Sequence, residues 1–147
     1  MKRLTSINEV LDFAIAGEVK SQELYMEMAA KAENPWMRKT LERLAQEEQQ
    51  HRAKLEKVKA GKIALGREQV DDLGIADTLE EIKPDASMDY REFLVFAIKK
   101  ENRAHKLYAR LASIFSEPDL SSLFNKLAAE EADHKRRFEV QYESLTS

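Results

Sequence analysis

The stretch LAQEEQQH, residues 44–51, returns as LAAEEADH at residues 127–134. In both copies a glutamate and a histidine stand three residues apart at the end of a run that begins with leucine. Residues three apart lie on the same face of an α-helix, so each Glu-x-x-His pair projects its two side chains in one direction. The two stretches therefore indicate a helical protein in which the same polar group is built twice.

The repeat extends well beyond these eight residues. Residues 11–29 align without a gap to residues 94–112, and the two segments share Leu, Phe, Ala, Ile, Glu, Leu, Tyr and Ala in place. The same offset relates three further pairs of identical residues: Pro35 and Pro118, Glu48 and Glu131, and His51 and His134. Because one offset aligns two helical segments and the turn between them, the chain is two copies of one helical hairpin.

Four segments have apolar residues at intervals of three and four, which is typical of the buried face of a helix. Ser6-x-x-Glu9 indicates a capping box at the start of the first segment. Asn34 followed by Pro35 indicates that the chain ends one helix and begins the next. The predicted parts are two hairpins, at residues 7–60 and 88–145, and a connection at residues 61–87.

These parts predict an all-α fold. It is a four-helix bundle of two antiparallel helical hairpins with a long crossover connection, and residues 1–147 form a single domain. The links within the hairpins are short, whereas the connection is long enough to run the length of a bundle. Within the connection, VDDLGIADTLEEI at residues 70–82 predicts one short helix.

The composition excludes several classes of function. A net charge of −3 and a pI near 5.7 give no basic field for nucleic acid. No segment has the roughly 20 apolar residues that span a membrane, and Asn8, Glu9 and Asp12 interrupt what would have to be a signal peptide. The absence of cysteine excludes disulfides and thiolate chemistry. We expect a soluble cytoplasmic protein that binds neither nucleic acid nor membranes.

Six polar residues occupy helix faces that are otherwise apolar: Glu18, Glu48, His51, Glu101, Glu131 and His134. Burying an ionised carboxylate costs several kcal/mol, and no Lys or Arg lies on the same faces. Two divalent cations would balance four carboxylates, and the two imidazoles would complete the ligand set. Carboxylates with one imidazole per ion suit iron or manganese better than structural zinc.

Two copies of a Glu followed by Glu-x-x-His resemble the ferritin-like di-iron carboxylate proteins, and the repeat and spacing are similar to those of the rubrerythrin-like family. The resemblance implies two iron ions in an Fe–O–Fe type site, with Glu18 and Glu101 as the single-glutamate ligands and the two Glu-x-x-His pairs as the others. It also implies that Tyr25 and Tyr108 lie just outside the ligands and bond to them. The alternative is that both tyrosines only fill the core.

The chain departs from this family in two places. Rubrerythrins usually have a second glutamate three residues after the position of Glu101, and here that residue is Ala104. They also usually carry a rubredoxin domain, which needs cysteines that this sequence lacks. The electron donor, such as a rubredoxin-like protein, is therefore expected to be a separate molecule.

The leading hypothesis is a rubrerythrin-like oxidoreductase that reduces hydrogen peroxide or dioxygen at a carboxylate-bridged dinuclear iron site. One alternative is a ferroxidase, iron-storage or iron-handling protein, and storage needs a closed shell of many subunits. The other is a structural helical bundle without a redox role. We expect a homodimer, in which the hairpins pair within one chain or are exchanged between two chains.

Three further polar residues allow two interpretations each. Glu47 and Glu130 also repeat. They lie about 100° round the helix from the ligands and are surface groups or neighbours of the ligands. His105 lies one turn after Glu101 and corresponds to Gln22 in the repeat. It is either an extra ligand or proton donor, or a hydrogen-bonded core histidine.

Overall fold

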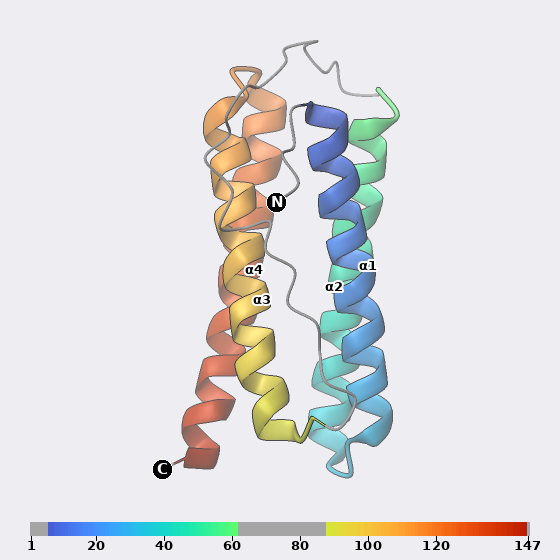
Figure 1. Cartoon of the computed structure of the whole chain (residues 1–147), viewed down its shortest axis with the longest axis vertical. Coiled ribbons are helices and arrows are strands. Elements are labelled where there is room, and N and C mark those ends of the chain that lie inside the picture. Colours follow the sequence, from blue (N-terminus) through green and yellow to red (C-terminus); the bar gives the residue numbers. More distant parts are fainter. Residues whose placement is uncertain (1–5, 62–87, 147) are drawn as a thin grey trace. The chain divides into compact units, whose positions relative to one another are not determined.

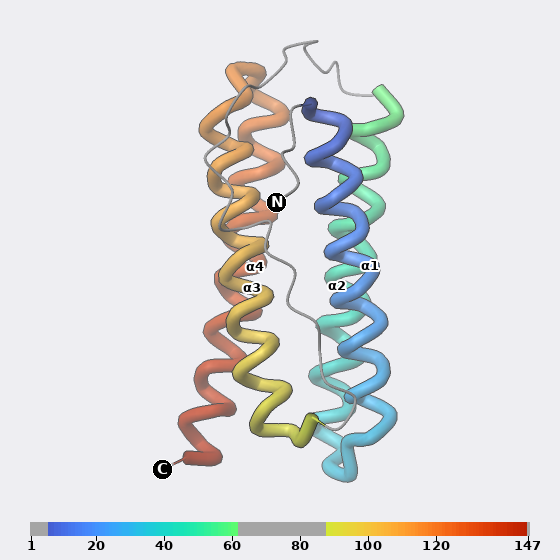
Figure 2. The backbone as a smooth tube through the Cα atoms, viewed as in Figure 1, coloured from blue at the N-terminus to red at the C-terminus, as the bar shows by residue number. Residues whose placement is uncertain are grey.

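A computed structural model of the protein describes residues 6–61 and 88–146. These residues form helices and no strand, in the order α1 (Ile7–Lys31), α2 (Pro35–Lys59), α3 (Tyr90–Ile114) and α4 (Pro118–Thr146). Helices α1 and α2 pack side by side as one antiparallel hairpin, and α3 and α4 as another (Figures 1 and 2). The all-α fold of two helical hairpins is confirmed. The two hairpins are compact units, and their union in a single domain stays a prediction.

The first hairpin begins and turns where the sequence predicts. The Ser6 side chain accepts a hydrogen bond from the Glu9 backbone N–H at 3.1 Å, which satisfies one of the open donors at the start of α1. Asn34 does the same for α2, with Pro35 at the first helical position. Gly61 follows the end of α2 with a positive φ, in the left-handed conformation that glycine adopts without strain.

The second hairpin begins slightly later than the sequence indicates. Asp89 accepts a hydrogen bond from the Glu92 backbone N–H at 2.7 Å, so α3 begins at Tyr90 and not directly after residue 87. At the turn, the Glu117 carboxylate accepts from the backbone N–H of Leu120 at 3.0 Å and caps α4. The negative charge of Glu117 also lies at the positive end of the helix dipole.

The buried faces of the helices follow the predicted spacing. In the first hairpin they are mainly aliphatic, with Leu11, Leu44 and Leu55 almost completely buried. In the second hairpin Phe93 and Phe138 pack edge to face, with ring centroids 5.8 Å apart. Burying one such side chain contributes about 1.5–3 kcal/mol, so these faces are the main source of stability in each hairpin.

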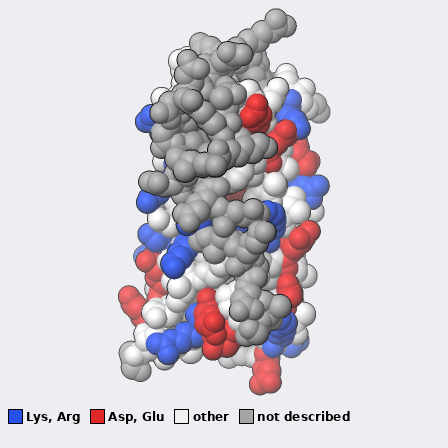
Figure 3. Space-filling model, viewed as in Figure 1, with Lys and Arg blue, Asp and Glu red and all other residues white. Residues whose placement is uncertain are grey.

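The exposed faces are charged and mixed in sign. On the face drawn in Figure 3, the Lys and Arg side chains of the described residues are interspersed with Asp and Glu. None of the helices in the described part of the chain is apolar over a stretch long enough to cross a membrane.

The predicted crossover connection and its short helix, residues 61–87, lie outside the described residues except for Gly61.

Candidate metal centre

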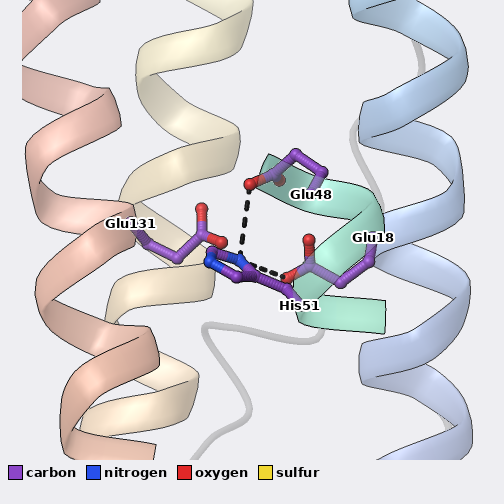
Figure 4. A group of neighbouring side chains, drawn as sticks. All are labelled: Glu18, Glu48, His51 and Glu131. Atoms are coloured by element: carbon purple, nitrogen blue, oxygen red, sulfur yellow. Dashed lines mark ion pairs between the residues drawn. The ribbon is translucent and has the colours of Figure 1, made fainter. Parts of the chain in front are cut away.

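The first hairpin brings together Glu18 from α1 with Glu48 and His51 from α2 (Figure 4), which we call the first trio. All three side chains are buried, with exposed fractions of at most 3%. The His51 Nδ1 atom lies 3.7 Å from Glu18 Oε1 and 3.5 Å from Glu48 Oε1. One ligand atom from each residue lies within 4.8 Å of the others, so the three can reach a common ion.

The second hairpin builds the same group from Glu101 on α3 with Glu131 and His134 on α4, which we call the second trio. These three residues are no more than 1% exposed. The His134 Nδ1 atom lies 3.6 Å from Glu101 Oε2 and 3.7 Å from Glu131 Oε2. The two trios therefore agree in composition, burial and spacing.

Helix geometry explains why each trio converges. The glutamate and histidine of a Glu-x-x-His pair lie three residues apart and so share one helix face. In α2 this face continues the apolar stripe, because Glu48 lies one turn after Leu44 and His51 one turn before Leu55. The antiparallel neighbour α1 presents Glu18 at the same level. The leucines that hold the hairpin together thus also place the polar group.

The charges of each trio favour a bound cation. Two ionised carboxylates with one imidazole carry a net negative charge, even when the histidine is protonated. Among the described residues no Lys or Arg side chain is buried, so none accompanies the four glutamates into the interior. Because an uncompensated buried carboxylate costs several kcal/mol, a divalent cation at each trio would remove the largest electrostatic cost in the hairpin.

The donor atoms fit a metal ion of the predicted kind. Each trio offers carboxylate oxygens and one imidazole nitrogen, a set that suits iron or manganese. Two atoms bound to one small divalent ion at about 2.1 Å lie roughly 3 Å apart. The 3.5–3.7 Å between Nδ1 and the carboxylates is slightly longer, so a small inward movement would complete the contacts. These buried groups could hold a metal.

The remaining candidates lie on the same helices. Tyr25 and Tyr108 are buried, and the Tyr108 ring stacks on Phe124 with centroids 6.2 Å apart. Their packing role is evident, and their bonding to a ligand stays a prediction. Glu47 and Glu130 are half-buried and belong to neither trio, as expected from their place on the helix.

His105 is half-buried, and its Nδ1 atom lies 2.9 Å from the backbone oxygen of Ala128 on α4. This favours the interpretation as a hydrogen-bonded histidine. Sequence reasoning missed Ser21, which is buried one turn after Glu18. The signal was available, because Ser21 lies three residues after Glu18 and corresponds in the repeat to Ala104, where rubrerythrins usually have the additional glutamate.

Helical hairpins that bury one Glu against a Glu-x-x-His pair define the class of ferritin-like carboxylate metal-binding proteins. A model of the rubrerythrin family matches residues 9–85 and 92–147, so the chain belongs to the rubrerythrin family. A solved structure, a hypothetical protein from Pyrococcus furiosus, is 25% identical to the chain. The match covers 96% of this chain and 90% of that one, with a TM-score of 0.76. A search of the curated proteins found no match.

Proposed function

We propose that the protein is an oxidoreductase of the rubrerythrin kind that reduces hydrogen peroxide or dioxygen with the help of two bound iron ions. The observation that carries the proposal is the doubled trio. In each hairpin two carboxylates and an imidazole are buried together, with their ligand atoms within 4.8 Å of one another. Membership of the rubrerythrin family supports iron as the metal.

We further propose that the two trios together hold one dinuclear centre. Four carboxylates would then balance two divalent ions, and the histidines His51 and His134 would give each ion one nitrogen ligand. When bound, the two reduced iron ions would supply the two electrons that, with two protons, convert hydrogen peroxide to two molecules of water. An external donor, such as a rubredoxin-like protein, would then return the electrons.

The chain's own residues would do the remaining work. The glutamates can shift between one-oxygen and two-oxygen contacts, and so accommodate a change in metal charge without a change in the helices. Tyr25 and Tyr108, seven residues beyond Glu18 and Glu101, are buried phenols from which protons could be donated. Because the six residues of the trios are at most 3% exposed, bulk water has little access to their carboxylates.

Replacing a ligand should separate the chemistry from the fold. Metal-free protein is loaded anaerobically with Fe(II), mixed with hydrogen peroxide, and followed by the ferric absorbance in stopped flow. Glu48→Ala and Glu131→Ala should each slow the peroxide-dependent oxidation at least 100-fold and leave the helical circular dichroism unchanged. The matched controls are Glu47→Ala and Glu130→Ala, which remove the adjacent half-buried glutamates and should leave the rate within about twofold.

Two results would contradict the proposal. Unchanged turnover in both ligand variants would show that the trios do not hold the reacting metal. Oxidation of Fe(II) by dioxygen that proceeds without an external electron donor, and that deposits many Fe(III) ions per chain in a large assembly, would favour the iron-storage alternative.

A further inference from the structure

His105 connects the two helices that carry the second trio. Its Nδ1 atom lies 2.9 Å from the backbone oxygen of Ala128, which makes it a link from α3 to α4. A carbonyl oxygen can only accept, so Nδ1 must carry the proton and the neutral ring must be the Nδ1–H tautomer. The carbonyl has two lone pairs and can accept this bond in addition to the helical one. The geometry therefore fixes both the orientation and the tautomer of the ring.

The link lies one helical turn from the metal ligands on both helices. His105 follows Glu101 by four residues on α3, and Ala128 precedes Glu131 by three residues on α4. Residues at these spacings share a helix face, so the bond is made on the side of the hairpin where the two glutamates meet. It restricts both the sliding and the rotation of α3 against α4 at the level of the second trio.

The first hairpin lacks this link. The repeat places Gln22 at the position of His105 and Ala45 at the position of Ala128. Within residues 6–61 and 88–146, the structure shows no hydrogen bond from the Gln22 side chain to the Ala45 carbonyl. The two trios thus have the same ligands and similar spacing, while only the second has a side-chain bond that ties its helices together one turn away.

We propose that His105 is a positioning residue that holds the second trio in its metal-binding arrangement, so that this trio binds a divalent ion more tightly than the first. The inference rests on the proposed function in one respect, that the trios hold metal. Ligands that are already held in place lose less freedom when the ion binds, and this raises affinity without any new contact to the ion. A net hydrogen bond corresponds to a factor of about five in an equilibrium constant, which sets the expected difference.

The repeat provides matched variants for a test with Co(II), which air does not oxidise and which reports binding through its visible absorption. His51→Ala isolates the second trio, and His134→Ala isolates the first. The second trio should bind Co(II) about fivefold more tightly. In the His51→Ala background, His105→Gln should reduce the affinity about fivefold. In the His134→Ala background, Gln22→His should increase the affinity of the first trio, because it adds the missing link.

Each outcome separates a positioning role from a general structural one. If His105 only stabilised the fold, His105→Gln would lower the melting temperature and leave the ratio of the two Co(II) affinities unchanged. That result would overturn the proposal. The Nδ1–H tautomer of His105 should appear in ¹⁵N NMR spectra, and the Nε2–H tautomer would also overturn it. If His105→Gln fails to fold, Gln22→His still decides the question. No Co(II) binding in either background would contradict both this inference and the proposed function.

Discussion

The two hairpins have the same buried polar groups but different apolar side chains in their cores. In the first trio Nδ1 of the histidine lies 3.7 and 3.5 Å from the two carboxylates, and in the second 3.6 and 3.7 Å. One turn or more away, Val10 and Leu55 of the first hairpin correspond to Phe93 and Phe138 of the second. Helix geometry therefore positions the ligands whether aliphatic or aromatic side chains pack around them.

Three other positions have diverged between the hairpins. Asn34 and Glu117 cap the second helix of each hairpin with different side chains. At the open end of each hairpin, the end away from its turn, Ile7 of the first hairpin corresponds to Tyr90 of the second. The Tyr90 hydroxyl group donates a hydrogen bond to Gln141. The histidine link to Ala128 is present in the second hairpin alone among the described residues. These differences make the two halves suitable as controls for each other.

The largest predicted effect tests the aromatic packing of the second hairpin. Phe138→Ala should lower the free energy of unfolding by about 4 kcal/mol, because it removes a fully buried ring and its contact with Phe93. Leu55→Ala, at the same place in the first hairpin, should cost about 3 kcal/mol. Urea denaturation of the metal-free protein measures both.

A conservative exchange serves as the control for this comparison. Phe138→Leu installs the residue of the first hairpin and should cost less than about 1.5 kcal/mol. Phe138→Ala, Leu55→Ala and Phe138→Leu should still bind as many metal ions per chain as the parent protein, because the ligands are unchanged. If Phe138→Ala were neutral, the ring would not support the second hairpin in the way the buried contact indicates.

A smaller effect is expected at the turns. The Asn34 side chain accepts from the backbone N–H of Trp36 at 2.8 Å and from that of Met37 at 3.3 Å. Because Asn34→Ala removes both bonds, it should cost about 1 kcal/mol. Glu117→Asn should be nearly neutral, since it replaces one capping side chain with another. Thermal unfolding measures both changes, and an Asn34→Ala variant as stable as the parent would show that the cap does not matter.

The smallest effect concerns the open end of the second hairpin. Burial raises the pKa of Tyr90 from 10.0 to about 12. Between these two values the unfolded chain loses the Tyr90 proton while the folded chain keeps it, so stability must fall as the pH rises through this range. Tyr90→Phe should cost about 0.5 kcal/mol at neutral pH through the lost bond to Gln141.

Denaturation at several pH values checks the Tyr90 prediction. The parent protein should lose stability relative to Tyr90→Phe between about pH 10 and pH 12, while the difference stays constant below pH 9. A difference that is constant up to pH 12 would contradict the assigned burial of the phenol.

Much of this arrangement could be predicted from the sequence, because helical spacing relates residues that are close along the chain. The starts of α1 and α2 followed from Ser6 and Asn34, and the members of each trio from the repeat. The bond between His105 and the Ala128 backbone could not be predicted, since it depends on how α3 is aligned against α4. The cap from Glu117 was also missed, because glutamate is an uncommon residue at that position.

The most direct test of the central claim, that each hairpin contributes one metal-binding trio, is an anaerobic titration of metal-free protein with Fe(II), measured as iron bound per chain. We expect saturation at two ions per chain for the parent protein and at one for His51→Ala and for His134→Ala. Negligible binding by the parent protein, or unchanged binding by both variants, would contradict it.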